Sequence, residues 1–278
     1  MSNLRFLVAG AVCWFLIAAN CQAADLILNG AGDSRLNFSS WDEKSAVWKI
    51  VDFKKENLNF SLYNNVPDSS IGLGVNSDSM SSDGRYALVQ RTIFGKLYDS
   101  EQVTETEKNY CDMVEMNSGC VLLSRSAEVC SGSWKGSIWS ADGGEIVKPK
   151  LETINPQKLI ESISTVRGST LRADAIKEQM FMGVDSYASC YSGVENVRAL
   201  NDLGFYLAQG GDDSGALRMY RRVESVGERT VLFLNIADSL WNTGKTSEAV
   251  KYYKKYADSM NTSGKSNKVP SRVAERTK

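Results

Sequence analysis

The chain has 278 residues, of which 42% are hydrophobic and 23% are charged, and its net charge is −1. These values are typical of a globular protein of one or two domains with a sizeable core. A nearly neutral balance of charge gives no reason to expect nucleic acid as a partner. The absence of histidine excludes Ser-His-Asp and Cys-His catalysis and removes the commonest metal ligand.

The remaining residues indicate no catalytic or cofactor site. The acidic pairs Asp112/Glu115 and Asp142/Glu145 are those expected of solvated charges on strands and turns. Residues 76–84 are rich in Asp and Ser but lack the closing Glu of a calcium loop, and no glycine-rich phosphate loop occurs. The cysteines lack the paired Cys-x2-Cys spacing of a zinc site. We therefore predict no enzyme activity, no metal and no cofactor.

Residues 1–24 have the pattern of a secretory signal peptide. Arg5 is the only charge, residues 6–19 form an apolar run, and Ala23 and Ala24 are the small residues of a cleavage site. The run is shorter than the about 20 residues that a spanning helix needs, so we expect cleavage rather than a membrane anchor. No later segment is long and apolar enough for membrane insertion. The mature protein is predicted to be periplasmic or secreted.

The cysteines support this location. Lipidation at Cys21 is the alternative, but Asn20 stands where a small residue would precede a lipidated cysteine. Cleavage leaves four cysteines in a compartment that favours disulfides, namely Cys111, Cys120, Cys130 and Cys190. Three of them lie within twenty residues, so full oxidation must join Cys190 to one member of that cluster, and three pairings remain open. Such a bridge would tie the helical half to the first half and stabilise the fold.

Residues 25–150 are predicted to form an antiparallel, β-rich N-terminal domain. Short runs with high strand propensity alternate there with Ser, Asn, Asp and Gly. The expected strands are 46–53, 58–63, 71–75, 86–94, 110–116 and 121–124. The alternation of Leu58, Phe60 and Leu62 with polar neighbours indicates a sheet with one solvated face, in a sandwich or a curled sheet. A hairpin turn is expected at 117–119, where Gly allows a positive φ.

Trp134 and Trp139 leave a second function open. They stand with Gly132 and Gly136 between strand-like pieces, and two exposed indoles would form a platform for a sugar. The alternative to protein binding is therefore a cell-envelope enzyme or a glycan-binding protein that works through the β domain. We favour the simpler interpretation, in which both side chains pack in the core near the cysteine cluster.

Helical spacing begins after residue 150, and residues 151–192 are predicted to be a helical connector that opens at Pro156. Residues 200–256 then carry nearly the same pattern twice, thirty-three residues apart. The matched pairs are Leu200/Phe233, Leu203/Ile236, Gly204/Ala237, Leu207/Leu240, Gly211/Gly244, Ala216/Ala249 and Tyr220/Tyr253. Each copy predicts two helices separated by a break, with the second helices capped near Asp212 and Thr246.

This pattern resembles the tetratricopeptide repeat, in which large apolar, small and aromatic residues recur in a helical hairpin. The resemblance implies two repeats over residues 193–260, with a concave face lined by the first helix of each. It places the partner-binding residues at Arg198, Asn201, Phe205, Gln209, Leu234, Asp238 and Trp241. Phe205 and Trp241 are expected to be exposed anchors for a partner. The family's clamp for peptide C-termini has Lys and Asn where this chain has Asn201 and Phe205, so that use is not expected.

The predicted fold class is α+β: a β-rich domain, then a short array of helical hairpins, with a polar and basic tail at 261–278 that is expected to be disordered. The expected function is binding of another protein, as an adaptor or an inhibitor. An immunity-type protein that neutralises a toxic effector and a scaffold for envelope assembly are two forms of this function. Self-association through the repeats is also open, and the sequence does not identify the partner.

Overall fold

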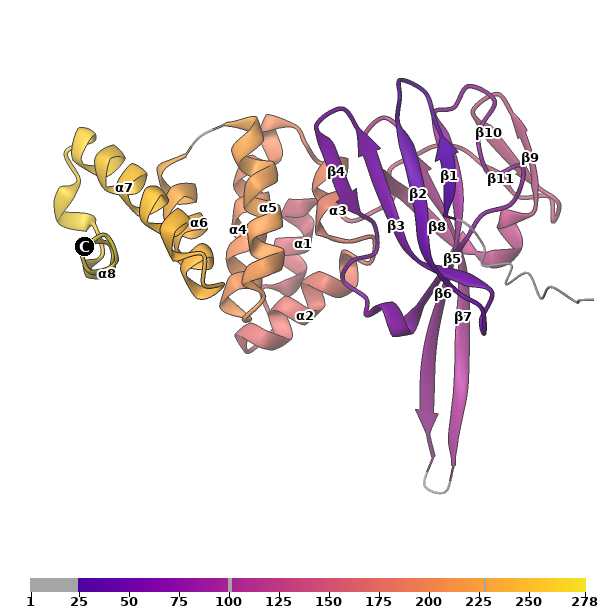
Figure 1. Ribbon diagram of the computed structural model, residues 1–278, viewed down its shortest axis with the longest axis horizontal. Coiled ribbons are helices and arrows are strands. Elements are labelled where there is room, and N and C mark those ends of the chain that lie inside the picture. Colours follow the sequence, from indigo (N-terminus) through magenta and orange to yellow (C-terminus); the bar gives the residue numbers. More distant parts are fainter. Residues whose placement is uncertain (1–24, 100–101, 228) are drawn as a thin grey trace, which may run out of the picture.

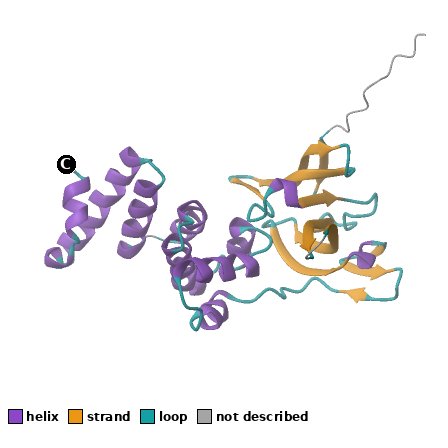
Figure 2. Ribbon diagram, turned by 90° about the horizontal axis from the view of Figure 1, so that it is seen from below, coloured by secondary structure: helices purple, strands orange, loops and turns teal. Residues whose placement is uncertain are grey.

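A computed structural model describes residues 25–99, 102–227 and 229–278. Antiparallel strands make up the N-terminal part and helices the C-terminal part (Figure 1), so the α+β prediction is confirmed. Seen from below, the strands lie at one end of the molecule and the helices at the other (Figure 2). The predicted signal peptide, with Cys13 and Cys21, lies outside the described residues. None of the described helices is long and apolar enough to cross a membrane.

Eight strands form one antiparallel sheet in the order β1-β2-β3-β5-β6-β7-β8, with β4 paired to the end of β3. They are β1 (Leu26–Asn29), β2 (Arg35–Asp42), β3 (Val47–Lys55), β4 (Leu58–Ser61), β5 (Ile71–Gly74), β6 (Tyr86–Tyr98), β7 (Val103–Glu115) and β8 (Cys120–Ser126). A second sheet has β10 (Ile138–Ala141) between β9 (Gly132–Lys135) and β11 (Ile146–Val147). The six predicted strands are present, and the structure adds β1, β2 and the second sheet.

The large sheet curls, so that its two ends approach each other. Gly119, in the predicted turn between β7 and β8, has φ +72° and faces β3 and β4. A Cβ atom at Gly119 would lie 2.6 Å from a ring atom of Phe60 and 2.7 Å from one of Phe53. The Ala31 N–H, after β1, donates to the carbonyl of Gly84 at 2.8 Å. A glycine at position 119 is therefore required both by the turn and by the closed curl.

Strands β6 to β8 are covered on both faces, which corrects the expectation of a solvated face. Ala87 and Val114 point into the main core, which continues into the helices. Their neighbours Leu88 and Met113 point to the other side, where a second core contains the buried Trp139 and the Cys111–Cys130 disulfide. The small sheet provides this second cover.

Beyond the rest of the sheet, β6 and β7 continue as a two-stranded arm (Figure 1). Within the described residues β5 pairs with β6 only as far as Ile93, and β8 pairs with β7 only from Tyr110 onward. Leu97, Tyr98 and Val103 near the end of the arm are exposed. The arm is therefore held by its own ladder of backbone hydrogen bonds.

The helices follow in pairs, as the spacing predicts. They are α1 (Pro156–Ile163), α2 (Ser169–Gln179), α3 (Val184–Cys190), α4 (Val197–Gln209), α5 (Asp213–Val226), α6 (Thr230–Asn242), α7 (Thr246–Thr262) and α8 (Ser271–Arg276). Short 3-10 turns lie at Asp68–Ser70, Ala127–Cys130, Val194–Asn196 and Ser266–Lys268. Helices α1 and α2 pack on α4, and α3 packs on both α5 and β8. The connector thus joins the helical array to the sheet.

Helix α3 is anchored to β8 in two ways. Cys190 at its end forms a disulfide with Cys120 at the start of β8. The Ser186 hydroxyl accepts from the Val121 N–H at 3.1 Å and donates to the Gly119 carbonyl at 2.7 Å. Both bonds join residues that lie far apart in the sequence. The expected bridge from Cys190 to the cysteine cluster is therefore present, and Cys120 is its partner.

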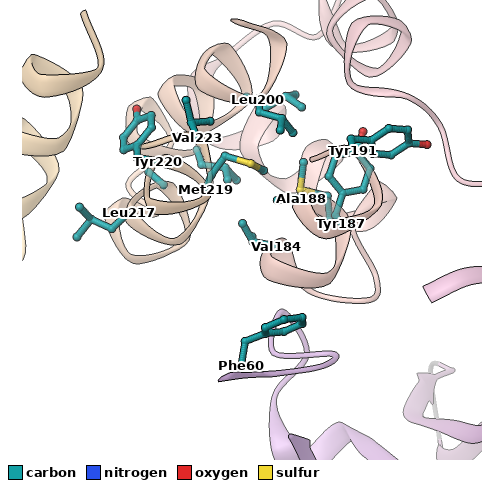
Figure 3. Close-up of a cluster of buried hydrophobic side chains, with 14 of the residues drawn as sticks. Phe60, Val184, Tyr187, Ala188, Tyr191, Leu200, Leu217, Met219, Tyr220 and Val223 are labelled. Carbon is teal, nitrogen blue, oxygen red and sulfur yellow. The ribbon is translucent and has the colours of Figure 1, made fainter. Parts of the chain in front are cut away.

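On its other side α3 contacts α5 and β4. Asp185 is buried and forms ion pairs with Arg218 and Arg222 of α5, each at 3.4 Å. The Arg222 guanidinium also lies 4.6 Å from the ring centroid of Phe60 in β4. Figure 3 shows Phe60 pointing from the sheet toward Val184 of α3. One continuous hydrophobic core therefore runs from the sheet into the helices.

The 70 residues between Cys120 and Cys190 make this disulfide the more stabilising of the two. In the chain-entropy account, a loop of this length adds about 4 kcal/mol to the free energy of unfolding, against about 3 kcal/mol for Cys111–Cys130. We expect C120S/C190S to lower the denaturant midpoint further than C111S/C130S, both measured on the mature protein. A larger loss from C111S/C130S would contradict this order. Non-reducing peptide mapping of the native protein gives the control for the pairing.

Asp112, expected to be solvated, is instead fully buried in an ion pair. The Arg91 Nε lies 2.6 Å from its carboxylate, and the Arg91 guanidinium is stacked between Tyr110 at 4.2 Å and Phe181 at 4.6 Å. Burial lowers the pKa of Arg91, but Asp112, Tyr63 and Tyr110 together raise it, so that the net shift is upward. Phe181 belongs to the helical part, so this ion pair lies at the junction of the two parts.

Removal of one partner leaves a buried charge unpaired, so we expect Arg91→Met to lower the free energy of unfolding by about 3–5 kcal/mol. The matched control is Lys177→Met, which breaks an exposed ion pair to Asp174 within α2 and should change it by less than about 1 kcal/mol. Equal effects in denaturant titrations would refute a structural role for the Arg91–Asp112 pair.

The C-terminal tail is helical rather than disordered. Residues 271–276 form α8, and Val273 within it is buried with 2% of its surface exposed. Arg272 and Arg276 form ion pairs with Asp238 of α6. The prediction of disorder is wrong because it counted the basic residues as solvated, whereas an acidic side chain on a preceding helix neutralises two of them.

Candidate functional site

The candidate site lies on the two helical hairpins α4–α5 and α6–α7. Each hairpin turns at a glycine with positive φ, Gly211 at +92° and Gly244 at +77°. The Asp212 side chain caps α5 by accepting from the Gly215 N–H at 2.8 Å. The sequence predicts a similar cap near Thr246, but the N-cap residue of α7 is Lys245, and no described side chain caps this helix.

Small residues bring the helices of each hairpin together. A Cβ atom at Gly204 of α4 would lie 2.5 Å from the ring of Tyr220 in α5, which has 1% of its surface exposed. The equivalent positions in the second hairpin are Ala237 and Tyr253, both fully buried. The first helices α4 and α6 are thus fixed against their partners, and their other faces are available to form a groove.

A groove with a volume of about 270 Å³ lies between α4, α6 and α8. It is lined by Phe205, Ala208 and Gln209 of α4, Asp213 and Tyr220 of α5, Asn235, Asp238, Ser239 and Asn242 of α6, and Arg272 and Arg276 of α8. Three of the predicted binding residues, Phe205, Gln209 and Asp238, therefore come together. Phe205 has 43% of its surface exposed and is not a core residue.

The other predicted residues lie around this groove. Asn201 is buried and accepts from the Asn235 amide at 3.1 Å, which links α4 to α6. Leu234 packs at the edge of the main core, and Arg198 is exposed. Trp241 is half-buried, with the Arg276 guanidinium 4.9 Å from its ring centroid. Trp241 is therefore not fully exposed as predicted, because the Arg276 side chain lies against its ring.

Two buried polar atoms of the groove residues have no hydrogen-bond partner within the described residues. They are Asp213 Oδ1 and the hydroxyl oxygen of Ser239, whose side chain has 1% of its surface exposed. Buried polar atoms without a partner are uncommon, since each lacks the hydrogen bond that water would supply. Both atoms are buried beneath the surface of the groove, so they are not themselves open to a ligand.

At the α8 end of the groove, Asp238 is the centre of a polar cluster. It accepts two hydrogen bonds from Arg272, at 2.9 and 2.7 Å, and one from Arg276 at 3.2 Å. The Tyr253 hydroxyl donates to the same carboxylate at 2.7 Å. Burial and this hydrogen bond to Asp238 raise the pKa of Tyr253 to about 12, so the phenol keeps its proton at neutral pH. The Asp238 charge is thus neutralised from within the chain.

Three polar residues that α6 contributes to the groove are not among the predicted site residues. Asn235, Ser239 and Asn242 lie at spacings of four and three residues in a mainly apolar helix, which places them on one face. That polar stripe is the signal from which they could have been found. Arg272 and Arg276 have the same four-residue spacing. Their role depends on a contact with Asp238, more than thirty residues away, which a local pattern cannot reveal.

The alternative aromatic platform in the β domain is not formed. Trp139 has 1% of its surface exposed, and its indole N–H donates to the Val129 carbonyl at 2.6 Å. Trp134 is half-buried, meets Trp139 edge to face at 5.2 Å, and donates to the Asp78 carbonyl at 3.0 Å. Trp139 is therefore a core residue, and Trp134 packs against this core from its edge. Of the acidic pairs, Asp112 is buried, and Glu145 pairs with Arg125 at 3.2 Å.

In the described part of the chain, no group of three or more Cys, Asp or Glu side chains could hold a metal ion. Three larger hollows exist, of about 720 Å³ between β4, α3 and α5, about 1010 Å³ beside the arm and about 410 Å³ beside the ends of β2, β3 and β4. The first is lined by ion pairs that join α5 to α3 and to α7. In comparisons with known proteins, no family model matches the chain, and no curated protein is significantly similar to it. The function is therefore inferred from geometry.

The close contact at Gly204 predicts that replacement of this helical glycine by alanine lowers the stability of the protein. Alanine normally stabilises a helix by about 1 kcal/mol relative to glycine, but Gly204→Ala forces a methyl group against the buried Tyr220 ring. We expect it to destabilise the protein by about 1–3 kcal/mol in thermal or denaturant unfolding. The control is Ala237→Gly at the equivalent position, which should destabilise by about 2 kcal/mol, from helix propensity and the loss of a buried methyl group. A stabilised Gly204→Ala variant would contradict the proposed packing.

Proposed function

We propose that the protein binds a segment of another protein in the groove between α4, α6 and α8, and that it acts as an adaptor or inhibitor outside the cytoplasm. The observation that carries this proposal is an exposed aromatic side chain, Phe205, in a groove whose other lining residues are mainly polar. Exposed aromatics are common anchors in interfaces. Polar groups in a pocket fix the orientation of what binds there.

The chemistry of the groove supports a peptide as the ligand. Gln209, Asn235 and Asn242 carry side-chain amides, each able to donate to a carbonyl and to accept from an N–H. A peptide backbone presents both of these groups along its length. The volume of about 270 Å³ suits one or two side chains rather than a large ligand. We therefore propose that the partner inserts an anchor beside Phe205 while its backbone crosses α6.

The resemblance to tetratricopeptide repeats agrees with this proposal, since the two hairpins have the helix lengths and small-residue contacts of such units. The two disulfides favour an oxidising compartment. Together with the signal-like residues 1–24, they support a periplasmic or secreted protein with its signal peptide removed. An immunity-type inhibitor of a toxic effector is the form of this function that fits a stapled, non-catalytic chain.

The test is affinity capture with the mature protein from a periplasmic extract. Phe205→Ala should reduce recovery of the partner at least tenfold, because truncation of a central anchor typically costs about 2 kcal/mol of binding free energy. Leu171→Ala is the matched control, since Leu171 is an exposed apolar residue of α2, with 64% of its surface exposed, and does not line the groove. Equal recovery with Phe205→Ala and the native protein would overturn the proposed site.

A further inference from the structure

The C-terminal helix α8 occupies one half of the proposed binding groove. Arg272 holds Asp238 with two hydrogen bonds, in the bidentate geometry that a guanidinium forms with a carboxylate. Arg276 adds a third bond to Asp238 and hydrogen-bonds the Tyr253 hydroxyl. Its guanidinium also lies 4.9 Å from the ring centroid of Trp241 and 5.7 Å from that of Tyr253. Two of the residues predicted to contact a partner, Asp238 and Trp241, are therefore already in contact with the chain's own tail.

The tail presents a simple pattern to this site. Arg272 and Arg276 are four residues apart, so one helical turn places both guanidinium groups on the same side of α8. Val273, next to Arg272, is the apolar residue of the helix that is buried. The recognised pattern is therefore Arg-Val-x-x-Arg on a short helix. Lysine would not reproduce it, because an ammonium group cannot form the bidentate contact.

The attachment of the tail is suited to exchange. Residues 261–268, between α7 and α8, are exposed. The Arg272 and Asp238 side chains retain 40% and 29% of their exposure in the ion pair, and ion pairs of this kind contribute little stability when they are exposed to solvent. The contact is favoured by the burial of Val273 and by the high local concentration of a segment on the same chain. A partner of the same chemistry can therefore compete with it.

We propose that the Asp238 half of the groove is a binding site for a basic helix with two arginines four residues apart, and that the tail occupies it in cis until a partner segment of that kind displaces it. This inference rests on the proposed function and specifies the partner's chemistry. Phe205 and Gln209 of the other half remain exposed, so a partner first meets that half. Displacement of α8 then opens Asp238 and Trp241 to the partner's arginines.

The test uses the full mature chain and a fluorescent peptide with the sequence of residues 266–278. In R272A/R276A the tail loses its contacts with Asp238, so the peptide should bind this variant at least tenfold more tightly than the native protein, by fluorescence anisotropy. Asp238→Asn in the same background should reduce binding at least tenfold. A peptide with both arginines replaced by lysine should also bind at least tenfold more weakly.

The matched control is K265A/K268A, which removes the same charge from exposed tail positions outside α8 and should bind the peptide no better than the native protein. Equal peptide binding by the native protein and R272A/R276A, or no binding to either, would overturn the proposal. A concentration-dependent dimer in size-exclusion chromatography would also overturn it, because the tail would then be exchanged between copies of the chain.

The peptide-binding test and the capture experiment can fail independently of each other. If the peptide binds R272A/R276A as expected while Phe205→Ala leaves capture unchanged, the arginine site stands and the proposed function fails. If Phe205→Ala abolishes capture while the peptide does not bind, the function stands and the arginine site fails. Circular dichroism of each variant excludes unfolding as the cause.

Discussion

The structure depends on the way in which helix α3 is fastened between the sheet and the helical array. The Cys120–Cys190 disulfide and the Ser186 hydrogen bonds fix α3 to β8, while Asp185 pairs with two arginines of α5. Asp185 is buried, and a buried carboxylate without partners would be strongly destabilising. The charge pairs therefore require α5 to stay against α3. Through α5 the same constraint fixes α4, and with it one wall of the groove.

This constraint explains how so few hairpins form a stable array. Repeat proteins bury their core between neighbouring units, so two hairpins alone leave both ends uncovered. Helices α1 and α2 cover α4 at one end, and α8 covers part of the second hairpin at the other. The sheet provides a further surface through Phe60, which lies against Arg222 of α5, and Arg91, which lies against Phe181 of the helical part. Within α8 the one buried side chain is Val273, so this cover is held by a single apolar residue together with the ion pairs to Asp238.

Much of the fold follows from local patterns. The offset of thirty-three residues predicts both hairpins, and the turns at Gly119, Gly211 and Gly244 follow from residues that tolerate positive φ. The missed strands β1 and β2 contain Asn, Ser and Asp, which have low strand propensity, and are stabilised by pairing with each other and with β3. The choice of Cys120 as the partner of Cys190 depends on the position of α3, which no spacing between cysteines encodes.

Local sequence patterns predict only part of the candidate site. Phe205, Gln209 and Asp238 could be predicted because the repeat pattern assigns them to one face of successive helices. The pairing of the Asp238 charge could not be predicted. Its partner Arg272 lies thirty-four residues later in the chain, beyond the residues that the repeat pattern covers. The two guanidinium groups give the tail the composition of a solvated segment, yet both of them pair with Asp238. A carboxylate that binds two arginines from its own chain has the geometry to bind two from another, so the neutralised half of the groove is as informative about the partner as the open half.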